Sequence, residues 1–213
     1  MKYTSCDIST KRYLCWIKRS ENDSSTAIKR LSEVNIAFWN ITRSAIFFLV
    51  KPKVNKTNIN SNNSEFRSLK LDETYNMNGA YLHELYFSNI SDVNSEIAMD
   101  SLPYIRLARD FGSFDNWQFD FLACCSAARC GWAVTYLNTY TQTYMNCFID
   151  LHTQSVPVGF YPVIVMDVWQ HAYYRDYLKD VKTYSKAMMK ELNWNVIAKR
   201  VEKADKMLAV LRS

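Results

Sequence analysis

In the stretch 166-MDVWQHAYYRDY-177, an apolar run of strand type gives way to a helical pattern that carries two polar residues of interest. Asp167 closes the apolar run, and His171 follows about one helical turn later. Carboxylate and neutral imidazole are ligands that suit iron, manganese or zinc. Polar side chains that are hydrogen-bonded within an aromatic core would give the same pattern. The stretch therefore predicts either half of a metal site or a polar cluster that is kept by packing.

Strand-type segments precede this stretch, and helical segments follow it. Short runs of β-branched and aromatic residues predict strands at 131–138, 143–152 and 160–167, with a hairpin turn from Asn138 to Thr143. Helices are predicted at 168–177, 184–194 and 195–211, and two more between 95 and 129, the second of them capped by Ser113. Helices together with a small antiparallel sheet predict an α+β architecture.

The N-terminal third predicts a helical hairpin. Apolar residues recur at helical spacing between Ser25 and Val50, and Pro52 ends the predicted helix. A second helix is expected to begin near Asn76. The expected organisation is an N-terminal extension at 1–25, a helical hairpin domain at 26–92 and a C-terminal α+β domain at 93–213 with a three-stranded antiparallel sheet.

The composition predicts a folded protein without a membrane span. Hydrophobic residues make up 48% of the chain and charged residues 22%, and no apolar run approaches the ~20 residues of a membrane helix. The N-terminus is basic without the apolar segment of a signal peptide, so secretion is not expected. Cys124, Cys125 and Cys130 lie in an apolar segment and no CxxC pair is present. This predicts buried free thiols in a reducing compartment, either mitochondrial or cytoplasmic.

The net charge of +5 is modest. Lysine and arginine are scattered along the chain except near its two ends, at 11–19 and 199–206. A solvated face is the simpler interpretation of these basic segments, and contact with an acidic partner such as RNA is the alternative.

The whole chain contains three histidines, at positions 83, 152 and 171. His83 lies in the predicted helical segment YLHELYF, residues 81–87. A lone histidine on an apolar face is more often a hydrogen-bonded core residue than a ligand. An aspartate such as Asp167, however, needs a partner to offset the cost of its burial. His83, Asp167 and His171 are therefore the candidate metal ligands.

Five segments of the chain follow in the order and spacing found in the iron/manganese superoxide dismutases. These segments are NGAYLHELYF (78–87), DFGSFDNWQFDF (110–121), CGWAV (130–134), VMDVWQHAYYRDY (165–177) and LNWNVIAKR (192–200). The chain resembles that family over residues 65 to 203. The resemblance implies that His83, Asp167 and His171 hold iron or manganese. It further implies that His152 hydrogen-bonds a solvent molecule bound to the metal and thereby tunes it.

The chain also departs from the family pattern. The fourth ligand of the family is a histidine on the first helix, and no histidine precedes His83 in this sequence. The register places Trp39 or Asn40 at that position; tryptophan cannot ligate a metal, and an amide oxygen is a weak donor. Gln170 stands where the family has a glutamate that pairs across its dimer, and Val134 replaces a tryptophan.

These departures favour a protein of the superoxide dismutase fold with a degenerate metal site and no bound cofactor. Such a protein would be a structural or docking subunit of a larger assembly, for example a mitochondrial ribosome, whose RNA would suit the basic ends of the chain. The first alternative is an active or residual dismutase that uses iron or manganese. The second is a zinc site formed by three ligands and water. A homodimer, or a heterodimer with a related chain, is expected.

Overall fold

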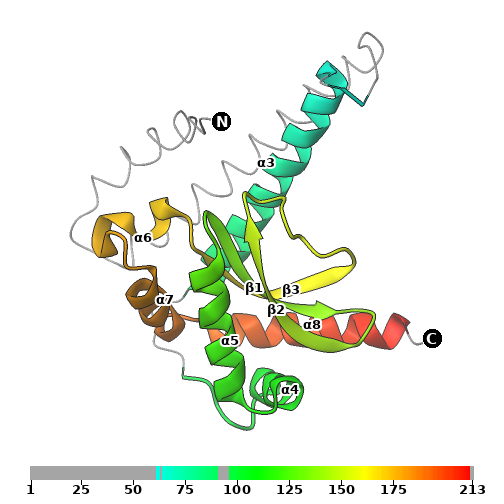
Figure 1. Cartoon of the computed structure of the whole chain (residues 1–213). Helices are drawn as coiled ribbons and strands as arrows, with labels where there is room; N and C mark the ends of the chain where they lie inside the picture. The colour runs from blue at the N-terminus through cyan, green and yellow to red at the C-terminus, as the bar shows by residue number, and fades with distance from the viewer. Residues whose placement is uncertain (1–60, 63, 91–95, 212–213) are drawn as a thin grey trace.

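The computed structural model describes residues 61–62, 64–90 and 96–211 of the 213-residue chain. The described helices are α3 (Glu65–Ser88), α4 (Leu102–Phe111), α5 (Phe114–Ala127), α6 (Gln170–Tyr177), α7 (Val181–Lys190) and α8 (Trp194–Leu211). The strands are β1 (Gly131–Asn138), β2 (Thr143–Asp150) and β3 (Phe160–Asp167). These elements confirm the predicted α+β fold (Figure 1).

The three strands form one antiparallel sheet in the order β2-β1-β3. Because side chains alternate along a strand, β1 sends Trp132 and Val134 to one face of the sheet and Ala133 and Leu137 to the other. These two sets belong to two separate hydrophobic clusters. The central strand β1 is therefore buried on both faces, as its continuous apolar sequence requires.

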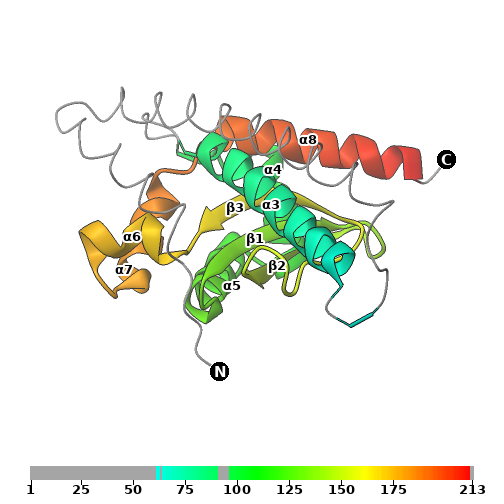
Figure 2. The ribbon, with the colours of Figure 1, turned by 90° about the horizontal axis from the view of Figure 1, so that it is seen from above.

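Helices cover both faces of this sheet. Leu82 and Tyr86 of α3 pack with Trp132 on one face, whereas Trp117 and Phe121 of α5 belong to the cluster on the other. Figure 2 shows α3 and α5 on opposite sides of the sheet, with α6 and α7 beyond one end of it. His83 of α3 also lies on this face, because its ring contacts Trp132 edge to face.

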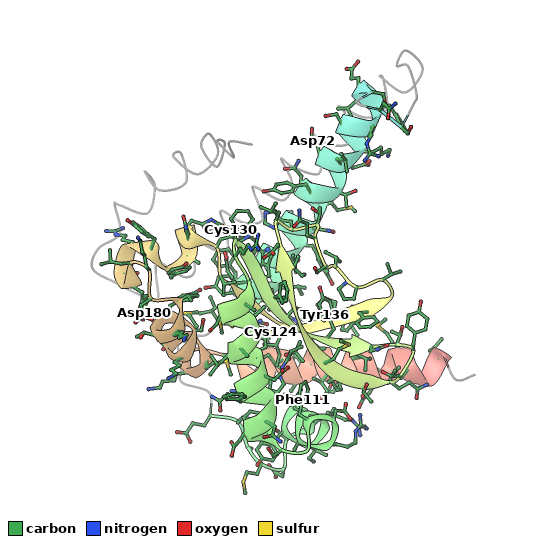
Figure 3. All side chains as sticks on the ribbon, viewed as in Figure 1. Asp72, Phe111, Cys124, Cys130, Tyr136 and Asp180 are labelled. Atoms are coloured by element: carbon green, nitrogen blue, oxygen red, sulfur yellow. The ribbon has the colours of Figure 1, made fainter. Side chains whose placement is uncertain are left out.

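The helix α3 is longer than its sequence suggests. It begins at Glu65, not near Asn76, because the Ser64 hydroxyl accepts a hydrogen bond from the Arg67 amide and caps it. The first half of α3 is polar and has no apolar stripe that would reveal a helix. This half, on which Asp72 lies, projects beyond the sheet (Figure 3). The other helix of the predicted hairpin lies outside the described residues, so the hairpin and the domain division stay predictions.

Asn89 ties the end of α3 to the rest of the molecule. Its side chain is fully buried and donates from Nδ2 to the Val165 carbonyl of β3 at 2.7 Å. Its Oδ1 accepts a hydrogen bond from the Arg200 guanidinium of α8, which also donates to the Leu85 carbonyl. The Asn89 carbonyl accepts from the Asn193 amide at 2.6 Å. The helix that carries His83 is thus fixed to the strand that ends at Asp167.

The structure also tests the predicted strands, the predicted helix cap and the predicted burial of the cysteines. The first and third strands, the turn between the first two strands and the Ser113 cap of α5 are confirmed. The second strand ends at Asp150 and not at residue 152, because Leu151 and His152 adopt positive φ in the turn that follows. The described cysteines are free, but only Cys125 is fully buried, and Cys124 and Cys130 are half-buried. Burial raises the pKa of the Cys125 thiol to about 12, so this thiol stays protonated. None of the helices in the described part of the chain is both long and apolar enough to cross a membrane.

Candidate metal centre

Three side chains from three elements converge on one point. His83 of α3, Asp167 at the end of β3 and His171 in the first turn of α6 each offer one donor atom, and these atoms lie within 4.8 Å of one another. His83 and His171 stack face to face, with ring centroids 5.8 Å apart. The structure therefore brings together the three candidate ligands, of which His83 and His171 lie 88 residues apart in sequence.

Asp167 is the most rigidly placed of the three. The register of the sheet pairs it with Trp132, so its side chain lies on the face that α3 covers. Its Oδ1 accepts a hydrogen bond from the Trp169 amide at 2.8 Å, which forms an Asx-type turn between β3 and α6. The side chain is 2% exposed. Its second oxygen, Oδ2, is left to face the two histidines.

His83 presents an unprotonated nitrogen to the site. Its Nδ1 lies 2.7 Å from the Gly79 carbonyl of the preceding helical turn. A carbonyl only accepts, so Nδ1 carries the proton and Nε2 of the neutral ring has a free lone pair. Burial lowers the pKa of His83, which keeps the ring neutral. This Nε2 lies 3.6 Å from Asp167 Oδ2, so a lone pair and a carboxylate oxygen face each other.

His171 pairs more directly with the aspartate. Its Nε2 lies 3.1 Å from Asp167 Oδ2, within hydrogen-bond distance. Burial lowers the pKa of His171, but the hydrogen bond to Asp167 and the charge of that carboxylate outweigh burial and raise it. Nε2 therefore donates a proton to Asp167 in the protein without metal. A metal ion at this point would displace that proton, as metal binding to imidazole commonly does.

His152 lies beside the three candidate ligands but makes different contacts. Its Nδ1 accepts a hydrogen bond from the Trp132 indole at 2.9 Å, so the neutral ring carries its proton on Nε2. The ring centroid lies 6.0 Å from that of His83 and 4.9 Å from Trp169. Burial, followed by the neighbouring His83, lowers the pKa of His152 to about 4. His152 is thus a neutral imidazole beside the site that keeps its proton on Nε2.

Gly79 serves the site in two ways that its sequence position does not reveal. Its carbonyl fixes the tautomer of His83, and the absence of a side chain lets the His152 ring lie against α3. A Cβ at this position would lie 3.1 Å from Nε2 and Cδ2 of His152. The ring has little room to retreat, because Tyr75 and Trp169 contact it at centroid distances of 4.7 and 4.9 Å.

The Gly79→Ala substitution should therefore destabilise the protein by about 1 kcal/mol. Overpacking destabilises by roughly 1–3 kcal/mol, and the better helix propensity of alanine stabilises by about 1 kcal/mol. Denaturant unfolding of the metal-free protein measures the difference. In a His152→Ala background the ring is gone, so the same change at Gly79 should stabilise by about 1 kcal/mol. Stabilisation in both backgrounds would show that the close contact between the His152 ring and α3 does not affect the free energy of unfolding.

The structure brings together most of the predicted site residues and adds one that was not predicted. The structure places His83, Asp167, His171 and His152 together, whereas Trp39 and Asn40 lie outside the described residues. The contribution of Trp132 was not predicted. The available signal was its place in the apolar strand at 131–138, since a tryptophan buried there needs an acceptor for its indole N–H.

Comparison with known proteins agrees with this fold. The model of iron/manganese superoxide dismutases, C-terminal domain, matches residues 104–200. An iron superoxide dismutase of Aquifex pyrophilus is 34% identical over 157 residues, which cover 74% of this chain and 73% of that protein. A manganese superoxide dismutase of Halobacterium salinarum is 34% identical over 133 residues, which cover 62% of this chain and 66% of that protein.

The three-stranded sheet and the helices between residues 104 and 200 agree with the match to the C-terminal domain of that family. The chain belongs to the iron/manganese superoxide dismutase family.

Proposed function

We propose that this chain binds iron or manganese through His83, Asp167 and His171 and converts superoxide to oxygen and hydrogen peroxide. The observation that supports this proposal is the convergence of three donor atoms within 4.8 Å of one another. One of these atoms, His83 Nε2, has a free lone pair and carries no proton. The lone pair of His83 Nε2 faces the Asp167 carboxylate without a proton between them, which is unfavourable until a cation lies there. Two imidazole nitrogens and one carboxylate oxygen suit iron and manganese.

The metal would supply the exchange of one electron: one superoxide gives up an electron to become oxygen, and a second takes that electron and two protons to become hydrogen peroxide. The chain's own residues hold the donors and a proton. Asp167 is fixed by the Trp169 amide, and His83 by the Gly79 carbonyl. His152 keeps a proton on Nε2 because Trp132 occupies its Nδ1. The buried indoles of Trp132 and Trp169 limit access of water.

A second candidate function is a metal-free structural or docking subunit of a larger assembly, such as a mitochondrial ribosome. It is favoured by the absence of any histidine before His83 and by Gln170 beside His171. In this case His83, Asp167 and His171 would remain as a polar network within the fold. Pairing with a second copy or a related chain, contact with RNA, and a mitochondrial or cytoplasmic location also stay predictions.

Metal analysis separates these functions. We expect about one iron or manganese per chain in protein purified without chelator and without added metal, measured by mass spectrometry, together with dismutation of superoxide by the same sample. Protein without metal and without activity would favour the structural subunit. Zinc in place of iron or manganese, again without activity, would favour the three-ligand zinc site.

A further inference from the structure

His152 lies in a turn whose backbone conformation needs support from outside. Leu151 and His152, directly after β2, both have positive φ angles, of 53° and 65°. This left-handed conformation is uncommon for residues other than glycine, and it persists only where surrounding contacts hold it. The Leu151 amide donates to the Cys130 carbonyl at 2.9 Å, which joins the turn to the residue before β1. The conformation of His152 itself requires a further contact.

Asn78 of α3 supplies that contact. Its side chain is half-buried, and its Nδ2 donates a hydrogen bond to the His152 carbonyl at 2.9 Å. The direction of the Cα–Cβ bond of a residue follows from its backbone angles. The hydrogen bond from Asn78 therefore sets the direction of the imidazole ring as well as the path of the chain.

The contacts of the His152 ring depend on this direction. Nδ1 accepts a hydrogen bond from the Trp132 indole at 2.9 Å. Tyr75 meets the ring edge to face at a centroid distance of 4.7 Å, and Gly79 leaves room for the ring edge that carries Nε2. A rotation of the backbone would move Nδ1 away from the indole, and either ring nitrogen could then carry the proton.

The same helix carries His152's supports and the candidate ligand His83. Asn78 and Gly79 precede His83 by about one helical turn. Since residues of one helix keep their relative positions, the contact from Asn78 also fixes the His152 ring relative to that of His83. The two ring centroids lie 6.0 Å apart.

We infer that Asn78 is a positioning residue, which acts on the candidate metal centre through His152. By holding the His152 carbonyl it keeps Nδ1 on the Trp132 indole, and it thereby keeps the proton of the ring on Nε2, beside the candidate ligands. The use of that proton rests on the proposed function, in which superoxide takes up protons to become hydrogen peroxide. The placement of the ring does not rest on it, so the test can be made without metal.

The Asn78→Asp substitution tests this inference in the metal-free full chain. The two side chains have the same shape, but a carboxylate donates no hydrogen bond to the His152 carbonyl. NMR of the imidazole nitrogens is measured at neutral pH, where His152 is uncharged because burial lowers its pKa to about 4. In the unchanged chain we expect His152 to carry its proton on Nε2 alone. In the variant we expect a mixture of the two tautomers.

Hydrogen exchange of the Trp132 indole N–H gives a second readout of the same change. In the Asn78→Asp variant the exchange should be roughly threefold to tenfold faster, the factor expected for the loss of one hydrogen bond. Asn76→Asp is the matched control, since it makes the same change at an exposed position of the same helix and should leave both readouts unchanged. Asn78→Ala introduces no charge and should shift both readouts in the same direction, so the test does not depend on folding of the aspartate variant.

A folded Asn78 variant in which His152 keeps one tautomer, and in which the Trp132 indole exchanges as slowly as in the unchanged chain, would overturn this inference whatever the stability of that variant. A residue with only a structural role would lower the free energy of unfolding without moving either readout. Because the samples hold no metal, that result would leave the proposed metal binding standing. A chain that fails to bind iron or manganese would overturn the proposed function and leave the placement of the His152 ring by Asn78 measurable in the same way.

Discussion

The Asp167→Asn substitution should lower the affinity of this chain for Fe²⁺ or Mn²⁺ by on the order of 100-fold or more. Loss of a residue that only supports a ligand already costs about 10–100-fold in metal affinity, and Asp167 is the only charged donor among the three. The substitution removes the negative charge that offsets the charge of the cation. Competition with a chelator of known affinity measures the loss.

The asparagine substitution is chosen because it keeps the shape of the side chain. Its amide oxygen still accepts the hydrogen bond of the Trp169 amide, so the turn between β3 and α6 is retained. Asp176→Asn in α6 is the control, because it removes the same charge from an exposed position close in sequence. Equal metal affinity for the Asp167 variant and the unchanged chain would place the metal elsewhere or exclude it.

The sequence predicts the ligands of this site better than it predicts their supports. Asp167 and His171 lie one helical turn apart, so a local pattern brings them together. The sequence predicts β1 and β3 equally well, since their apolar runs coincide with the observed strands. His83 was a candidate because the chain has only three histidines, and the resemblance to a known family then supported it, since nothing local links it to Asp167.

The supports depend on the register of the sheet and on the rotation of α3. Trp132 lies beside Asp167 because of the register between β1 and β3, and it reaches His152, just after β2, because of the register between β1 and β2. The role of Gly79 depends on a contact with a ring that is more than seventy residues away in sequence. A one-residue slip in either element would abolish these contacts while leaving the sequence pattern unchanged. The polar first half of α3 was missed because its helix depends on a cap at Ser64 and not on an apolar stripe.

The Asn89→Leu substitution should destabilise the protein by about 3–4 kcal/mol, because several buried polar groups lose their partner at once. The Val165 carbonyl loses its donor, and the Arg200 guanidinium loses the Oδ1 acceptor. Leucine has the same branched shape but is larger, so the loss comes from unsatisfied hydrogen bonds and from crowding at a fully buried position, and not from a cavity. Denaturant unfolding of the metal-free protein measures the change.

Asn76→Leu is the matched control, since it makes the same substitution at an exposed position of the same helix and should change stability by less than about 0.5 kcal/mol. Because Asn89 fixes α3 to β3, the Asn89 variant should also hold metal more weakly, with His83 no longer aligned with Asp167. Saturating metal should then recover part of the lost stability, since metal binds only the folded chain. A variant as stable as the unchanged chain would mean that α3 is held to the sheet by the packing of Leu82 and Tyr86 alone.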